Sequence, residues 1–376
     1  MQVRQLGCVV LGLALVLSAC SQSPEAKKAN HQKQGLAYYD KEKYQEAIIE
    51  YKNVVQLDPK DADAHYRLAL SYIKVGGLQN LQAAFGELTK SIELDPKNED
   101  AQVKLGEMYL LGREPAKAKE RAEIVLASAP QNKDGLILHG QSLIVQQQFQ
   151  EGIAELKKAI AIDPKNIRVY LDLTRAYLQL KDQKSAEETL QQALLADPKS
   201  TDIRVALGDL KMMTGKIAEA EADYKQAVDM EPEKDALYYK LAGYYQLNKK
   251  WDQAEATYLQ LTIKKPKDEG PQIVLGEYYK FSGQMDKALE SFKKAHELNA
   301  KSEGARDRLI DHYLNTGKLD EAEKIVTALL EKNKKDLAGR YFTGRLDLAK
   351  GKTEEAIELF QGVIKDEPQS APAHQY

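Results

Sequence analysis

Apolar residues recur at every third or fourth position along most of this chain, and short polar stretches interrupt them at regular intervals. Residues 235–266 show the pattern clearly, because two apolar stripes flank the polar stretch LNKK. The stripes consist of Leu237, Leu241 and Tyr244, and then of Trp251, Ala254, Tyr258 and Leu261. This spacing places each stripe on one face of a helix. The pattern therefore predicts two helices joined by a polar turn. Trp251 is expected to pack inside, like the apolar residues that stand three positions before the small residue elsewhere in the chain.

Prolines show that the helix pair is repeated. Six of them lie 34 residues apart, at Pro96, Pro130, Pro164, Pro198, Pro232 and Pro266. The step from Pro59 to Pro96 is 37, so the repeat that contains KVGGLQNLQ carries three additional residues. A small residue also recurs once in every repeat, twelve residues before the periodic proline or the position that corresponds to it. These small residues are Ala47, Ala84, Ala118, Gly152, Ala186, Ala220, Ala254, Ala288, Ala322 and Ala356. A small residue there lets two helix backbones approach closely, and proline ends each pair because it cannot continue a helix.

Glycine and tyrosine follow the same period. The glycines are Gly35, Gly106, Gly140, Gly208, Gly276 and Gly344, and tyrosines follow three residues after this phase at Tyr38, Tyr109, Tyr177, Tyr245, Tyr279 and Tyr313. This pattern of small residue, aromatic, alanine and proline resembles the tetratricopeptide repeat, a helix-turn-helix unit of 34 residues. The resemblance implies ten repeats, at 28–61, 62–98, 99–132, 133–166, 167–200, 201–234, 235–268, 269–302, 303–336 and 337–370. Stacked pairs bury a continuous core, so we expect an all-α solenoid. The resemblance implies that this solenoid is a right-handed superhelix.

Residues 1–20 differ from the rest of the chain. The apolar run Cys8–Leu17 is too short to span a bilayer and has the features of a secretory signal. The letters LSAC that end at Cys20 resemble the lipobox of bacterial lipoproteins. This resemblance implies that residues 1–19 are a signal peptide, that Cys20 is lipidated, and that residues 20–27 are a short tether. The alternative is an ordinary signal peptide with an incidental cysteine.

The residue after the cysteine bears on the compartment. In Gram-negative lipoproteins an Asp at this place tends to retain the protein at the inner membrane, and Ser21 stands there in this chain. The resemblance therefore implies a lipid-anchored protein of the cell envelope, on the outer membrane and facing the periplasm if the source is Gram-negative.

Charge and motifs point away from nucleic acid and catalysis. Lys and Arg number 54 against 57 for Asp and Glu, so the net charge of −3 gives no field that would recruit DNA or RNA. The string GKT at Gly351–Thr353 has Leu346 where a phosphate-binding loop needs glycine, and it lies at the phase of a turn between helices. No two of the six histidines stand at a metal-ligand spacing. We therefore expect no enzyme, no metal and no cofactor.

The remaining candidate is the surface of the first helices. In the family that the chain resembles, defined positions of each first helix line a concave groove. Carried over by position, the candidate peptide-binding residues are Tyr39, Tyr66, Leu70, Ile137, Gln141, Arg175, Met212, Tyr239, Glu277, Phe281, Tyr341 and Arg345. Apolar and aromatic side chains with single charges between them suit an extended or helical peptide. Some of these residues could instead pack against the neighbouring first helix; for Tyr239, Phe281 and Tyr341 we expect exposure.

Together these features indicate a membrane-anchored protein–protein interaction scaffold. Lipobox, short tether and long array resemble the repeat lipoproteins of exosortase and PEP-CTERM protein sorting, which accompany exopolysaccharide export. The partners would be envelope or secreted proteins bound in the groove. One alternative is an outer-membrane assembly or polysaccharide-secretion lipoprotein without a sorting role. Another is the repeat part of a larger protein whose effector domain is missing.

The last residues match the start of another repeat. Residues 371–376 share the phase of residues 62–67, including Ala-x-Ala-His. A solenoid end normally needs a polar cap, and six residues cannot form one. We therefore expect a truncated eleventh repeat; the alternative is a true terminus covered by a partner.

Overall fold

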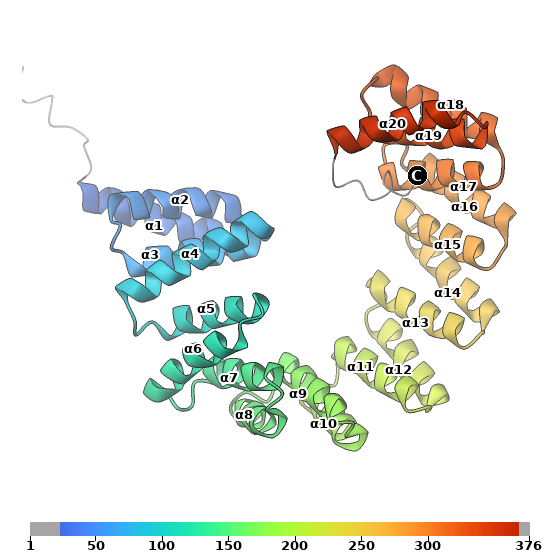
Figure 1. Cartoon of the computed structure of the whole chain (residues 1–376). Helices are drawn as coiled ribbons and strands as arrows, with labels where there is room; N and C mark the ends of the chain where they lie inside the picture. The colour runs from blue at the N-terminus through green and yellow to red at the C-terminus, as the bar shows by residue number, and fades with distance from the viewer. Residues whose placement is uncertain (1–22, 368–376) are drawn as a thin grey trace, which may run out of the picture. The chain divides into compact units, whose positions relative to one another are not determined.

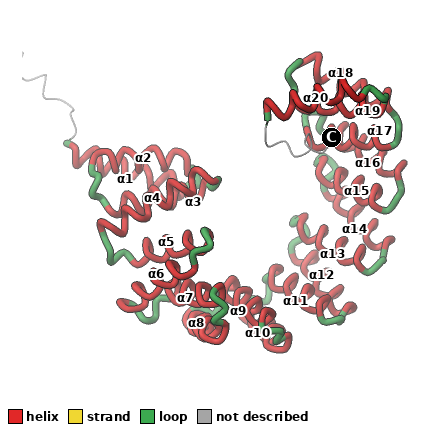
Figure 2. The backbone as a smooth tube through the Cα atoms, in the orientation of Figure 1, coloured by secondary structure: helices red, strands yellow, loops and turns green. Residues whose placement is uncertain are grey.

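The computed structural model describes residues 23–367, and over that range the chain forms helices joined by short turns, without strands (Figures 1 and 2). The first helices of the pairs are α1 (Pro24–Asp40), α3 (Ala62–Val75), α5 (Glu99–Leu111), α7 (Lys133–Val145), α9 (Ile167–Gln179), α11 (Thr201–Met213), α13 (Asp235–Leu247), α15 (Glu269–Phe281), α17 (Glu303–Asn315) and α19 (Leu337–Ala349). The second helices are α2 (Tyr44–Leu57), α4 (Leu78–Leu94), α6 (Pro115–Ser128), α8 (Phe149–Ile162), α10 (Gln183–Ala196), α12 (Ile217–Met230), α14 (Trp251–Lys264), α16 (Met285–Leu298), α18 (Leu319–Lys332) and α20 (Thr353–Asp366). The predicted all-α repeat solenoid is confirmed.

The helices form two compact units. Within the described residues, the first unit covers 23–206 and the second covers 207–367, and the division falls inside α11. In each unit a first helix packs against its own second helix, and that second helix packs against the next first helix (Figure 1). First helices of successive repeats also touch, as α5 does with α7 and α15 with α17. Each unit is therefore a stack of helix pairs.

Helix α1 begins earlier than the predicted repeat. The Ser23 side chain accepts a hydrogen bond from the Ala26 amide, Pro24 occupies the first helical position and Glu25 lies in the first turn. All three features favour the start of a helix. Residues 24–27, which the sequence suggested as part of the tether, are therefore helical. The lipobox with Cys20 and the predicted eleventh repeat at 371–376 lie outside the described residues.

Small residues set the distance between the helices of a pair. All nine alanines of the periodic set are 0% exposed. Gly152 replaces alanine once, and there a Cβ atom would lie 2.8 Å from the carbonyl oxygen of Gly140. Gly276 plays a related role, because its Cβ would lie 2.5 Å from the Phe292 ring. The expectation that these positions permit close helix packing is confirmed.

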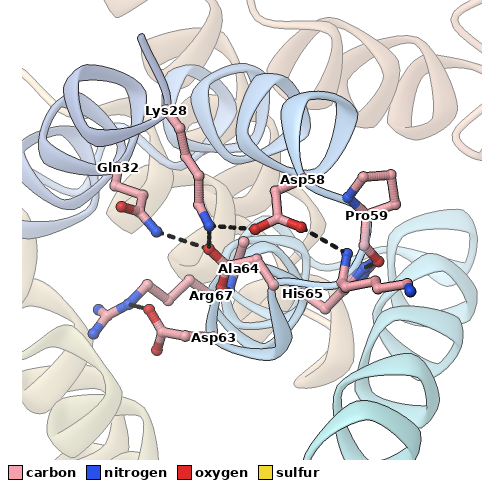
Figure 3. A network of polar contacts seen from close by, with 10 residues as sticks. Lys28, Gln32, Asp58, Pro59, Asp63, Ala64, His65 and Arg67 are labelled. Carbon is pink, nitrogen blue, oxygen red and sulfur yellow. Dashed lines mark hydrogen bonds and ion pairs between the residues drawn. The ribbon is translucent and has the colours of Figure 1, made fainter. Parts of the chain in front are cut away.

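Polar side chains fix the turns between repeats in the first unit (Figure 3). Lys28 forms ion pairs with Asp58, at 2.5 Å, and with Asp61, at 2.7 Å. A ring nitrogen of His65 lies 3.1 Å from the carbonyl oxygen of Pro59, in the same turn. Gln102 donates to Pro96 in the corresponding way. These contacts hold the turn in place at the start of the next first helix. The periodic proline therefore belongs to the contact region between two successive repeats.

In the second unit a carboxylate joins neighbouring repeats. Glu221 of α12 lies 2.5 Å from Lys250 and 2.7 Å from Lys225, and it accepts a hydrogen bond from Tyr245 at 3.2 Å. Burial acts to raise the pKa of Glu221, but the hydrogen bonds from the two lysines outweigh it and lower the pKa to about 2. Glu255 repeats the arrangement one period later, with Tyr279 at 2.8 Å. Tyr245 and Tyr279, two of the periodic tyrosines, therefore link successive repeats.

Candidate functional site

The candidate site is the surface that the first helices present, which we call the first-helix face. All twelve predicted groove residues lie on first helices. None of them is buried: Arg175 and Phe281 are exposed, and the other ten are half-buried. The structure thus places these residues at least partly on the surface of each unit, and ligand binding by them stays a prediction.

Charges on this face are paired between repeats. Residues 31 positions apart meet in three places: Gln141 donates to Asp172, Lys240 pairs with Asp209, and Arg308 pairs with Glu277, each at 2.6 Å. Arg345 pairs with Asp311 of the preceding repeat. The sequence suggested single charges between apolar positions, and the structure corrects this for Glu277 and Arg345. Their charges are largely compensated by a neighbouring first helix.

Aromatic side chains on the face remain neutral and partly accessible. Burial raises the pKa of Tyr66 to about 12, and it raises the pKa of Tyr239 as well. Both phenols therefore keep their proton at neutral pH and can donate a hydrogen bond to a ligand. Tyr341 is half-buried and packs beside Phe342 and Phe360. Of the three aromatics expected to be exposed, only Phe281 is largely so, at 73%.

Trp251 departs from the sequence-based prediction of a core residue. Its side chain is 41% exposed, and its ring centroid lies 6.4 Å from that of Phe281. Trp251 is the first residue of α14, whereas Ala254, Tyr258 and Leu261 later in the same helix are buried. Trp251 and Phe281 thus form an exposed aromatic pair at the helix turns of the second unit.

The first unit contains a groove on this face. It has a cavity volume of 320 Å³ and is lined by Ile73, Leu81, Lys104, Glu107, Met108, Leu110, Leu111, Gln141 and Arg168. Gln141 was a predicted site residue. Leu81 was missed because it belongs to a second helix, and the three-residue insertion in its repeat was the available signal. Arg168 was missed although its place in the repeat matches a groove position.

The second unit contains a larger and more polar cavity of 680 Å³, lined mainly by α17, α19 and the turn before α19. Tyr341 is the predicted residue in its wall. Eight of the fourteen lining residues are charged, and among them Arg306 lies 2.8 Å from Asp307. Burial raises the pKa of Asp307, and the hydrogen bond from Arg306 opposes this shift. The cavity is therefore lined mostly by charged residues, and Arg306, Asp307, Arg308 and Asp311 among them form ion pairs.

In residues 23–367, no group of three or more His, Cys, Asp or Glu side chains is placed to hold a metal ion. None of the helices in that range is both long and apolar enough to cross a membrane. The GKT string lies where α19 ends and α20 begins, with Gly351 at a φ of 79°, as the periodicity predicted.

Comparisons with known proteins agree with this architecture. Family models described as tetratricopeptide repeats match residues 143–210, 211–273, 282–346 and 35–76. No curated protein sequence matches the chain.

Several solved structures are similar to parts of the chain. Pseudomonas aeruginosa pilF is 23% identical over 60% of this chain and 100% of its own, with a TM-score of 0.44. MamA from Desulfovibrio magneticus RS-1 is 20% identical over 46% of this chain and 96% of its own, with a TM-score of 0.42. A tetratricopeptide repeat protein from Parabacteroides merdae is 17% identical over 66% of this chain and 97% of its own, with a TM-score of 0.43. From its repeat period, its helix pairs and the matched family models, the chain belongs to the tetratricopeptide repeat family.

Proposed function

We propose that the chain is a membrane-anchored scaffold of the cell envelope that holds partner proteins on its first-helix face. Repeats of this family imply a protein–protein interaction scaffold, and the half-buried and exposed apolar residues of the face suit a peptide ligand. The pathway that we propose is protein sorting or exopolysaccharide export. Membrane attachment is through lipidated Cys20.

The observation that carries this proposal is the short distance along the chain between the LSAC sequence and the helices. Cys20 precedes Pro24, the first residue of α1, by only four positions. Four residues span at most about 14 Å when extended. A lipid on Cys20 would therefore keep the first repeats close to the membrane surface, where envelope proteins are available as partners.

Fractionation tests the anchor. Cys20→Ala should move the protein from the membrane fraction to the soluble fraction, because a lipid anchor supplies the attachment. Ser21→Ala serves as the matched control and should leave the protein with the membrane. A Cys20→Ala protein that stays in the membrane fraction would exclude lipid anchoring at this residue.

Capture from detergent-solubilised envelopes tests the scaffold. The parent chain should retain a defined set of envelope proteins, and the double variant Tyr239→Ala with Phe281→Ala should retain fewer of them. Sorting substrates or export components among the captured proteins would support the pathway, whereas outer-membrane assembly factors would favour the assembly role. Unchanged capture by the double variant would count against binding at the second unit's part of the face.

A further inference from the structure

The groove of the first unit has an apolar floor built from several helices. Ile73 of α3, Leu81 of α4, and Met108 and Leu111 of α5 contribute its aliphatic and thioether surface. Ile73 and Met108 also pack against the buried core of this unit, which fixes their positions. Leu111 is 65% exposed. The floor is thus preformed, as in most ligand sites, and it is accessible at Leu111.

The insertion in the second repeat shapes one wall of this groove. Helix α4 has 17 residues, whereas the other second helices have 14. The additional turn comes before Leu81, which therefore lies inside the helix. Trp251 is the residue that corresponds to Leu81 in another repeat, and it is the first residue of its helix. The insertion thus makes this wall different from the corresponding surface of the other repeats.

The charges of the groove leave one cation without a partner. Lys104 pairs with Glu107 at 2.9 Å, and the Gln141 amide donates to Asp172 at 2.6 Å. Arg168 at the start of α9 is exposed, and no described residue forms an ion pair or hydrogen bond with its side chain. The groove therefore combines an apolar floor with one uncompensated positive charge.

We infer that this groove binds a segment of a partner protein that carries apolar side chains of the size of Leu, Met or Phe together with a carboxylate that meets Arg168. The inference rests on the proposed scaffold function and names the class of partner. Apolar side chains gain by leaving water on the floor. A guanidinium fits a carboxylate through two parallel hydrogen bonds, and a basic segment would be repelled.

Two matched pools of fluorescent synthetic nonapeptides test the inference on the full chain in detergent. Each pool varies two positions among Leu, Met and Phe in a Ser and Gln background; one pool has a fixed Glu, and the other has a fixed Lys. By fluorescence anisotropy, the Glu pool should bind about fivefold more tightly than the Lys pool, as expected for an accessible charge pair. Arg168→Glu should reverse this order, and Lys165→Glu, an exposed lysine outside the groove, should not.

The floor is tested with Leu81→Ser and, because Leu81 is half-buried, also with the exposed Leu111→Ser. Both should weaken the two pools alike, while Leu195→Ser, at an 82% exposed leucine on α10, should weaken neither. The inference is overturned if neither pool binds, if both bind equally to the parent, if Arg168→Glu leaves the order unchanged, or if Leu111→Ser has no effect.

The same variants separate this inference from the proposed function. If Arg168→Glu and Leu111→Ser retain all the envelope proteins that the parent captures, the groove assignment fails while the scaffold function stands. If the parent captures no envelope protein, the scaffold function fails, and the peptide pools still decide the groove.

Discussion

The two units are built from the same 34-residue repeat, but they present different surfaces. The groove of the first unit has a largely apolar lining, and its Arg168 has no ion-pair partner among the residues that the structure describes. The cavity of the second unit is lined mostly by charged residues, and its arginines Arg306 and Arg308 are paired with Asp307 and Glu277. The repeat period therefore conserves the packing positions and leaves the first-helix face free to differ from unit to unit.

The joints between helices differ as well. In the first unit, histidines meet carboxylates: His31 lies 2.6 Å from Glu50, and His65 lies 2.5 Å from Glu87. In the second unit, tyrosines donate to carboxylates, as Tyr279 does to Glu255. These contacts differ in chemistry and in place, because the His–Glu pairs join the two helices of one repeat, whereas Tyr279 of α15 reaches Glu255 of α14 in the preceding repeat. Substitutions should therefore separate the two units by both stability and binding.

The largest effect is expected from the core of the second unit. Phe292→Ala removes a side chain that is 1% exposed and should lower the free energy of unfolding by about 3–5 kcal/mol. Phe281→Ala, at a 73% exposed ring, should change it by less than about 0.5 kcal/mol. Urea denaturation measures both, and hydrogen exchange should show lost protection in α15 to α17 with α1 to α8 retained. Equal loss of protection in α1 to α8 would contradict separate units.

A pair of glycines tests the close helix packing. Gly276→Ala places a methyl group 2.5 Å from Phe292 and should destabilise the protein by about 1–3 kcal/mol. Gly243→Ala, also inside a helix, meets nothing within 4 Å and should stabilise it by about 0.5–1 kcal/mol. Thermal unfolding of the two variants should move in opposite directions, and a shared direction would refute the packing argument.

Acid should weaken the contacts that Glu221 makes with Lys250, Lys225 and Tyr245 in the second unit. Because the pKa of Glu221 is lowered from 4.5 to about 2, its contribution to stability is complete above pH 4.5 and is lost as the pH falls toward 2. Glu221→Gln should cost about 1–2 kcal/mol at pH 7. The difference from the parent should shrink below pH 4.5. Glu297→Gln, on a largely exposed side chain, should show no such trend; a constant difference for Glu221→Gln from pH 7 to pH 3 would show that its charge is not the cause.

The smallest effect is expected from the paired charges on the first-helix face. Arg308→Gln breaks the pair with Glu277, in which both side chains are more than a third exposed. Such pairs contribute about 0–1 kcal/mol, so unfolding should change little. The apparent affinity for envelope partners should also stay within about twofold if the charge is already compensated. A large loss of capture would show that Arg308 contacts a partner directly.

Much of the fold could be predicted from the sequence, because one period determines it. The alanines at 0% exposure and the tyrosines between repeats all lie at positions that a count of 34 residues identifies. The candidate site could be predicted less completely from the repeat period. Trp251 has the phase of a core residue yet lies at a helix start, and Leu81 reaches the groove from a helix that an insertion lengthened. The pairing of Glu277 with Arg308 depends on side-chain reach between repeats, which one sequence does not reveal.

The central claim is that partners bind the first-helix face, and crosslinking in cells tests it most directly. A photoreactive amino acid is placed at one of three exposed positions: Leu111 in the first unit's groove, Phe281 on the face of the second unit, or Leu195 on a second helix. Exposure is similar at the three, at 65%, 73% and 82%. The account predicts crosslinks to envelope proteins from positions 111 and 281 and none from position 195. Crosslinks from position 195 alone would contradict it.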